Sequence, residues 1–419
     1  MAVNRRLFLA ASALATPVLC TSSSFAVAEP MNRPGSVVPG ADRLAADGWR
    51  RLSGRKVGVL SNPTGVLANS DHIVDSLVAA GVTPAAAFGP EHGFRGSAQA
   101  GGSEGDYVDP RSGVPVYDAY GASADELAGM LTKAGVDTVV FDIADIGARF
   151  YTYIWSMYTA QLAAAKTGAS FVVLDRPNPL GGDAFGPVLD PAFDSGVGLK
   201  PIALQHGMTV GELARFFAAE FLPAEGVEPG ELDVVEVAGW QRDSRFADTG
   251  LVWAAPSPNM PTSQTALSYV GTGLFEGTEL SEGRGTTQPF EIIGAPGIDW
   301  RWREELATAG LGGVTFRETY FVPTSGKFAG QDCGGVTLAV TDPHAYDAIG
   351  TAITMIVSAK RLYPGVFRWR EDNFIDKLAG SDRLRKQVDA GADTAEIVGA
   401  WQRELADFRA RREPYLRYR

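Results

Sequence analysis

The chain has 419 residues, and its formal net charge at pH 7 is −12. This charge excludes nucleic acid and anionic membrane surfaces as expected partners, because proteins bind both through clustered Lys and Arg side chains. The length exceeds what one compact core usually holds, and 45% of the residues are hydrophobic. We therefore expect two packed domains.

Cysteine and histidine usage argues against a disulfide framework and against a metal site. Cys20 falls within an N-terminal leader, so Cys333 is the only thiol expected in the mature chain. The four histidines show no His-Glu-x-x-His spacing, and no Cys pair accompanies them. We expect stability to come from packing, and we expect neither a metal nor a cofactor.

Residues 1–28 have the pattern of an export signal. Arg5 and Arg6 precede an Ala-rich apolar run that ends at Leu19, and small residues follow at 26–28. The run is interrupted and shorter than the roughly 20 residues of a membrane span, which favours cleavage before Glu29 over anchoring. Paired arginines indicate the twin-arginine route, with ordinary secretion as the alternative. We expect a periplasmic, cell-envelope or extracellular protein.

Apolar runs of four or five residues alternate with amphipathic helices through the next part of the chain. Such alternation predicts a Rossmann-like α/β domain, in which helices cover both faces of a parallel sheet. Ser123 with Glu126, and Thr209 with Glu212, have the spacing of helix capping boxes. The strands are expected at 57–60, 84–88, 138–141 and 171–174, and the helices at 73–78, 123–135, 154–162 and 209–221.

A proline-rich stretch, residues 255–262, suggests a crossing between two domains. The predicted domains are 29–262, the Rossmann-like domain, and 263–419, a smaller α/β domain. In the latter we expect strands at 314–322 and 336–340, a helix opened by Asp342 and Pro343, and a solvated helical end from 393 to 418.

Three polar loops, punctuated by Gly and Pro, follow predicted strands and begin at Gly89, Asp142 and Asp175. Because ligands of parallel sheets bind beyond the carboxyl ends of the strands, we expect these loops to form a site. Neither Gly-x-Gly-x-x-Gly after the first strand nor a Gly-x-x-x-x-Gly-Lys-Ser/Thr motif is present, which argues against a nucleotide. A second polar segment, 276–291, belongs to the other domain, so the active site is expected in the cleft between them.

Four segments of the chain resemble the signature blocks of the NamZ-like exo-β-N-acetylmuramidases: 89–96, 142–153, 174–182 and 276–296. The resemblance implies a Rossmann-like N-terminal domain and a smaller C-terminal domain. It also implies hydrolysis of a terminal N-acetylmuramic acid from the non-reducing end of peptidoglycan fragments, so a muropeptide or disaccharide is the expected partner. Ala144 and Glu279 depart from the family pattern, which usually has glutamine and asparagine there.

Hydrolysis of a glycosidic bond needs an acid for the leaving oxygen and usually a second carboxylate. Glu91, on a tight loop at the cleft, is the expected acid with a raised pKa. The alternative for Glu91 is a salt bridge to Arg95 or Arg149. The candidates for the second carboxylate are Asp142, Asp145, Glu276 and Glu282, of which we favour Glu282. Asp142 has turn capping as its alternative role. Participation of the substrate's acetamido group in place of a second carboxylate stays open.

The other expected site residues bind the sugar. A guanidinium suits the lactyl carboxylate, which Arg149 or Arg284 would grip unless each simply pairs with a neighbouring carboxylate. Tyr151 offers an aromatic face to a sugar ring. The full predicted substrate-binding set is His92, Arg95, Asp145, Arg149, Tyr151, Asn178, Glu276, Glu279 and Arg284.

Two other function classes remain as alternatives. A carbohydrate-binding envelope protein without turnover is suggested by the departures at Ala144 and Glu279. A serine amidase or esterase would use Ser281, although Glu279 occupies a position where a Gly-x-Ser-x-Gly elbow requires glycine.

Overall fold

Residues 36–419 are described by a computed structural model. The expected export signal, residues 1–28, therefore lies outside the described residues, and its cleavage stays a prediction. Among residues 36–419, no helix combines the length and the hydropathy needed to cross a bilayer.

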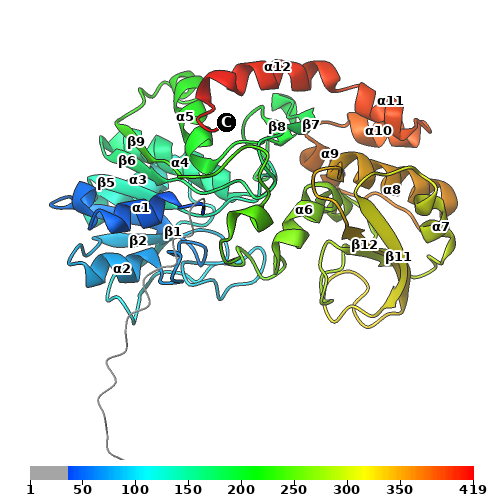
Figure 1. Ribbon diagram of the computed structural model, residues 1–419, viewed down its shortest axis with the longest axis horizontal. Coiled ribbons are helices and arrows are strands. Elements are labelled where there is room, and N and C mark those ends of the chain that lie inside the picture. Colours follow the sequence, from blue (N-terminus) through cyan, green and yellow to red (C-terminus); the bar gives the residue numbers. More distant parts are fainter. Residues whose placement is uncertain (1–35) are drawn as a thin grey trace, which may run out of the picture. The chain divides into compact units, whose positions relative to one another are not determined.

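The N-terminal part of the described chain is built on a mostly parallel sheet (Figure 1). Within residues 36–419, seven strands pair in the order β3-β4-β2-β1-β5-β6-β9, and only β3 and β4 are antiparallel neighbours. This sheet confirms the predicted Rossmann-like class. The strands are β1 (Val57–Ser61), β2 (Ala86–Gly89), β3 (Tyr107–Val108), β4 (Pro115–Asp118), β5 (Thr138–Asp142), β6 (Ser170–Leu174) and β9 (Leu232–Val235).

Helices cover both faces of this sheet, as strands with buried side chains on both sides require. Val57 and Val59 pack in one apolar cluster with α1 and α2, whereas Leu60 packs in another with α3, α4 and α5. Alternation of side chains along a strand produces this division. The helices are α1 (Gly40–Ala46), α2 (Ile73–Ala79), α3 (Ala124–Ala134), α4 (Tyr153–Thr167) and α5 (Val210–Glu220).

Both predicted capping boxes are present at helix starts. Ser123 and Glu126 exchange side-chain and backbone hydrogen bonds before α3, and Thr209 and Glu212 do the same before α5. Each box satisfies two N–H groups that a helix leaves without an internal partner.

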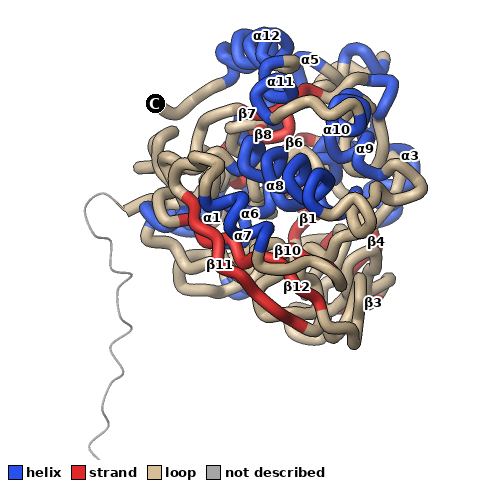
Figure 2. Tube along the Cα trace, turned by 90° about the vertical axis from the view of Figure 1, so that its right-hand side faces the viewer, coloured by secondary structure: helices blue, strands red, loops and turns tan. Residues whose placement is uncertain are grey.

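The C-terminal part contains a smaller antiparallel sheet, in the order β10-β12-β11, with β11 and β12 forming its longest pair (Figure 2). It confirms the expected smaller α/β region. The helix expected at Asp342 instead begins at Ala348, because Asp347 caps it by accepting the Gly350 N–H at 2.9 Å. The elements are α6 (Ser263–Thr272), β10 (Ile292–Ala295), α7 (Arg301–Ala307), β11 (Val314–Phe321), β12 (Cys333–Val340) and α8 (Ala348–Leu362).

The C-terminal end differs from the single solvated helix that we expected. Two helices occupy this stretch, and Leu405 and Phe408 are buried in the main core. Arg412 donates to the carbonyls of His206 and Gly182 at 2.7 and 2.9 Å, so the end of the chain returns to the N-terminal part. These two helices are α11 (Thr394–Gly399) and α12 (Gln402–Arg412), and they are preceded by α9 (Phe374–Ala379) and α10 (Arg383–Asp389).

The remaining elements are short. An antiparallel pair joins β7 (Phe185–Val188) and β8 (Ala203–Gln205). Short 3₁₀ helices span Arg50–Leu52, Pro191–Phe193, Pro223–Glu225, Phe246–Thr249, Gly273–Gly277 and Glu413–Tyr415.

Candidate active site

The loop that follows β2 is folded around the carboxylate of Glu104. This carboxylate accepts the N–H groups of Arg95 at 3.1 Å and Ser97 at 2.9 Å, and the Tyr107 hydroxyl at 2.9 Å. Gly93 has a φ of 88°, and a Cβ on it would lie 2.2 Å from Glu104 Cδ, so glycine is required there. The sequence offered no pattern that would single out Glu104.

Glu91 lies on this loop and is half-buried. Its Oε1 accepts the Gly101 N–H at 2.8 Å, and its Oε2 accepts the Thr152 hydroxyl at 3.3 Å. The next residue, His92, has a φ of 71° and donates its backbone N–H to Gly102 at 3.0 Å. The carboxylate is thus held between its own loop and the segment that follows β5.

A group of two acids and two cations comes from the C-terminal part. Arg284 Nη2 lies 2.7 Å from Glu276 Oε1, and Arg284 Nε lies 3.2 Å from Glu282 Oε1. Lys327 Nζ binds Glu282 Oε2 at 2.9 Å and also donates to the carbonyls of Phe275 and Leu280. Burial raises the pKa of Glu276, and the charge of Arg284 opposes this shift.

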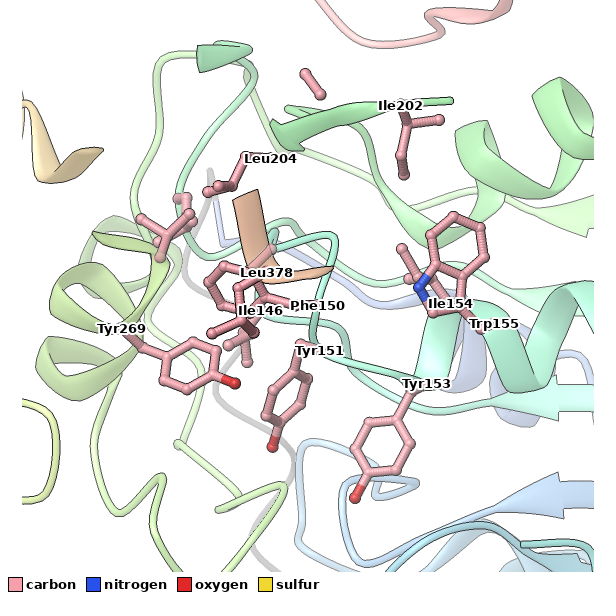
Figure 3. Close-up of a cluster of buried hydrophobic side chains, with 14 of the residues drawn as sticks. Ile146, Phe150, Tyr151, Tyr153, Ile154, Trp155, Ile202, Leu204, Tyr269 and Leu378 are labelled. Atoms are coloured by element: carbon pink, nitrogen blue, oxygen red, sulfur yellow. The ribbon is translucent and has the colours of Figure 1, made fainter. Parts of the chain in front are cut away.

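Glu91 and Glu276 line one cavity of about 150 Å³, which we call the Glu91 cavity. Tyr269, Tyr151 and Tyr153 lie side by side along it, and the hydroxyl of Tyr269 points toward Tyr151 (Figure 3). The ring of Tyr151 is 5.3 Å from that of Tyr153 and 5.7 Å from that of Tyr269, in edge-to-face contacts. Its lining includes Glu91, His92, Tyr151, Thr152, Tyr153, Ser257, Asn259, Met260, Tyr269, Glu276, Arg284 and Phe290.

Five predicted site residues therefore share this cavity: Glu91, His92, Tyr151, Glu276 and Arg284. Sequence reasoning missed Tyr269 in α6 and Ser257 and Asn259 in the proline-rich crossing. The crossing carried a signal, because a segment between two domains borders the cleft they form. Tyr269 carried none, since an aromatic residue in a helix is ordinarily part of a core.

The favoured second carboxylate, Glu282, does not line the Glu91 cavity. Its side chain is 6% exposed and is bound on both oxygens, by Arg284 and by Lys327. The structure places Glu276 rather than Glu282 at the cavity surface, which favours Glu276 as the candidate for the second carboxylate.

Asp142 and Asn178 have structural roles. Asp142 is fully buried and forms a two-point ion pair with Arg176 at 2.6 and 2.8 Å. Asn178 accepts the Leu180 N–H at 2.9 Å and donates to the Met208 carbonyl at 2.9 Å. Neither lines the Glu91 cavity, since both side chains are used to fix the ends of strands β5 and β6.

Arg95 anchors the Glu91 loop and does not face the cavity. It lies between Asp75, at 2.9 Å, and Asp109, at 2.6 Å. The hydrogen bond from Arg95 holds the pKa of Asp109 below its usual range, although burial opposes this shift. The predicted alternative, a salt bridge between Glu91 and Arg95, is also absent from the ion pairs of residues 36–419.

Arg149 is fully buried, and so it is not placed to grip a substrate carboxylate. Its guanidinium donates to three backbone carbonyls, those of Pro187 at 2.9 Å, Ile202 at 3.0 Å and Leu378 at 2.8 Å. Leu378 itself lines the Glu91 cavity, so Arg149 supports the cavity wall from behind. Burial lowers the pKa of Arg149.

The positions behind the two alternative functions lie outside the Glu91 cavity. Glu279 is exposed, and Ala144 lines a different cavity that also contains Asp145. Ser281 is 1% exposed, and its hydroxyl accepts the Gly283 N–H at 3.2 Å. Among the described residues, no histidine is hydrogen-bonded to Ser281, as a Ser–His pair would require. Nor do residues 36–419 contain a cluster of three or more His, Cys, Asp and Glu side chains suited to a metal ion.

Two carboxyl groups at one cavity, on a two-part α/β fold, are typical of a glycoside hydrolase. The family model described as exo-beta-N-acetylmuramidase NamZ, N-terminal, matches residues 57–264, and its C-terminal counterpart matches residues 267–418. The chain belongs to the exo-β-N-acetylmuramidase NamZ family and is a glycosidase.

Similar proteins support this assignment along nearly the whole chain. The peptidoglycan beta-N-acetylmuramidase NamZ of Bacillus subtilis (strain 168) is 44% identical over 385 residues, which are 91% of each chain. The crystal structures of two DUF1343 family proteins from Bacteroides fragilis NCTC 9343 are each 30% identical to the chain. The first has a TM-score of 0.83, and the match covers 92% of this chain and 100% of that protein. The second has a TM-score of 0.74, and the match covers 91% of this chain and 99% of that protein.

Proposed function

We propose that the chain is an exported exo-acting glycosidase that releases terminal N-acetylmuramic acid from the non-reducing end of peptidoglycan fragments. The observation that carries the proposal is the placement of Glu91 and Glu276 on one cavity with Arg284. The name of the Bacillus subtilis relative, a peptidoglycan beta-N-acetylmuramidase, supports the substrate class.

In this proposal Glu91 is the general acid. It gives its proton to the glycosidic oxygen as the bond from that oxygen to the anomeric carbon breaks, and the bonding electrons leave with the oxygen. One water supplies the hydroxyl that ends on the anomeric carbon and the proton that restores Glu91. Glu276 is the second carboxylate, because it lines the same cavity and reaches it from the facing segment.

Arg284 recognises the lactyl carboxylate that distinguishes muramic acid from glucosamine. Its guanidinium lies at the cavity between Glu276 and the ring of Phe290, which is 5.0 Å from it. The planar guanidinium of Arg284 offers a carboxylate two parallel hydrogen bonds, and Lys327 shares with it the charge of Glu282. The Tyr151 and Tyr269 rings provide an apolar wall for the sugar.

Export is proposed from the paired arginines and the small residues at 26–28 alone. The test is to express the full chain in a host with and without a functional twin-arginine translocase and to sequence the mature N-terminus. A chain that begins at Glu29 outside the cytoplasm only when that translocase is present supports the proposal. Retention of residues 1–28 contradicts it.

The enzymatic proposal is tested with purified chain starting at residue 29 and a chromogenic aryl N-acetyl-β-muraminide. We expect Glu91→Gln to lower kcat by about 100-fold or more, because an amide cannot supply the proton. Glu279→Gln is the matched control, since Glu279 is exposed and outside the cavity. If Glu91→Gln releases the chromophore as fast as the unaltered chain does, Glu91 is not the general acid. If the unaltered chain binds the sugar but does not cleave the substrate, it is a binding protein.

A further inference from the structure

A second cavity, of about 290 Å³, lies at the carboxyl ends of strands β1, β5 and β6. We call it the Asp145 cavity. Its lining includes Asp145 and Arg176 from the loops after β5 and β6, and Trp253 and Ala254 from the segment that leads into the interdomain crossing. This is the edge of a parallel sheet where ligands ordinarily bind, yet none of the steps assigned above uses it.

Asp145 contributes a buried acceptor without a protein partner. Its Oδ2 accepts the Gly147 N–H at 2.8 Å and lies 2.9 Å from His206 Nε2. His206 Nδ1 accepts the Met208 N–H at 3.2 Å, so Nε2 carries the proton that is donated to Asp145. Asp145 is 6% exposed, and among residues 36–419 nothing is hydrogen-bonded to its Oδ1. A buried carboxylate oxygen of this kind requires a donor, which a ligand would supply.

The charges at the Asp145 cavity select a neutral ligand. The guanidinium of Arg176 is neutralised by its ion pair with Asp142, whereas the buried Oδ1 of Asp145 has no hydrogen-bond partner among residues 36–419. An anionic group would therefore meet a carboxylate and no free cation, but a hydroxyl or amide N–H would meet an acceptor. Leu251, Trp253 and Pro177 provide apolar surface for the carbon faces of such a ligand.

The Asp145 cavity adjoins the Glu91 cavity. Pro256 lines the former and the next residue, Ser257, lines the latter. Tyr153, a lining residue of the Glu91 cavity, donates its hydroxyl to the Pro256 carbonyl at 2.7 Å. Asp145 is also near enough to Tyr151 for its charge to contribute to the raised pKa of that tyrosine, which burial dominates. The Pro256–Ser257 segment therefore borders both cavities.

We propose that the Asp145 cavity binds the neutral amino sugar on the leaving-group side of the scissile bond, with Asp145 Oδ1 accepting one of its hydroxyl or amide protons. This inference rests on the proposed function. The anionic terminal sugar then occupies the Glu91 cavity beside Arg284, and its uncharged neighbour occupies the Asp145 cavity. The two cavities thus fix the direction in which a substrate binds.

The test compares two substrates in Asp145→Asn, which keeps an oxygen for His206 and Gly147 but presents an amide donor where Oδ1 stood. One substrate is 4-nitrophenyl N-acetyl-β-muraminide, whose aglycone has no hydroxyl donor. The other is the disaccharide with N-acetylglucosamine as leaving sugar. We expect kcat/KM for the disaccharide to fall by about 10- to 100-fold, the range for a hydrogen bond to a charged group, and that for the aryl substrate to stay within about twofold.

A second variant keeps the test decisive if Asp145→Asn folds poorly. Ala254→Phe adds a ring to the half-buried lining and leaves Asp145 unchanged, and we expect it to raise KM for the disaccharide by about fivefold or more. Equal losses on both substrates in Asp145→Asn, or an unchanged disaccharide KM in Ala254→Phe, overturn the subsite alone. An unaltered chain that cleaves neither substrate overturns the proposed function and this subsite with it.

Discussion

Arg284 Nη2 lies 2.7 Å from Glu276 Oε1, so the carboxylate that lines the Glu91 cavity is bound directly to a cation. Glu282 is bound by the same guanidinium but also by Lys327. The two glutamates therefore differ in their surroundings. Glu276 faces the space where a substrate would bind, and Glu282 holds two cations in place behind it.

This difference predicts opposite outcomes for two similar variants. We expect Glu276→Gln to lower kcat on the aryl muraminide by about 100-fold or more, because a reacting carboxylate is lost. Its unfolding free energy should fall less than that of Glu282→Gln, because Glu276 binds one cation and Glu282 binds two. We expect Glu282→Gln to lower the unfolding free energy by about 1–3 kcal/mol, because Lys327 and Arg284 lose a charged acceptor. Kinetics and urea denaturation of both variants check this, and a greater loss of kcat in Glu282→Gln would restore Glu282 as the second carboxylate.

Gly93 offers a test of the loop that carries Glu91. Ala in its place combines a left-handed backbone, at φ 88°, with a Cβ only 2.2 Å from Glu104 Cδ. We expect Gly93→Ala to lower the unfolding free energy by about 1–3 kcal/mol. We also expect it to lower kcat by about tenfold or more, because the Glu104 side chain must move and lose its hydrogen bonds to the loop. Gly105→Ala is the control: its φ is 72°, but no atom lies within 4 Å of its added Cβ. An equal loss of kcat in both variants would show that Glu104 does not position Glu91.

The strands that sequence predicted well are those whose side chains are buried on both faces. The runs at 57–60, 138–141 and 171–174 coincide with β1, β5 and β6, and apart from Thr138 none of them contains a polar side chain. The antiparallel edge strand β3 has two residues, and its neighbour β4 begins with Pro115, so neither gives a run of apolar residues. Short edge strands form because they pair with a neighbouring strand, and the local sequence pattern does not reveal that pairing.

The sequence predicted which loops form the site, but it did not predict which of their side chains face the cavity. Glu276 lies near the end of a short 3₁₀ helix and Glu282 follows it by six positions, so no single period predicts which side chain faces the cavity. Arg149 and Arg284 look alike in sequence, yet one is surrounded by backbone carbonyls and the other lies at the cavity. Such differences arise from tertiary contacts, including the contact of Arg149 with Leu378, which is 229 residues away.

The two arginines give a third prediction. We expect Arg149→Lys to lower the unfolding free energy by about 2–4 kcal/mol, because an ammonium cannot reach all three buried carbonyls. We expect Arg284→Lys to raise KM for the muraminide by about tenfold, because the planar fork that suits a carboxylate is lost. Denaturation and kinetics separate the two effects. An Arg149→Lys protein of normal stability but raised KM would show that Arg149 binds the substrate.

A fourth prediction concerns Asp175, which is buried where β6 ends. Burial raises the pKa of Asp175 from its ordinary value of 3.8 to about 7, although hydrogen bonds from Tyr418, Gly211 and Thr209 oppose this shift, and the charge of Glu212 adds to it. The folded chain therefore binds this proton more tightly than the unfolded chain. The stabilisation from that proton is complete below pH 3.8 and is lost as the pH rises through about 7.

Tyr418→Phe should consequently cost more at alkaline pH than at acid pH. At about pH 8.5 Asp175 is ionised, and losing the hydroxyl removes a hydrogen bond to a charge, worth about 1.5–3 kcal/mol. At about pH 5.5 the protonated carboxyl loses a neutral hydrogen bond, worth about 0.5–1.5 kcal/mol. The loss of the acceptor for the Val237 N–H, 2.9 Å from the Tyr418 hydroxyl, adds the same cost at both values. Urea denaturation of both proteins at the two pH values measures the difference, and a cost that is equal at both would place the ionisation of Asp175 outside this range.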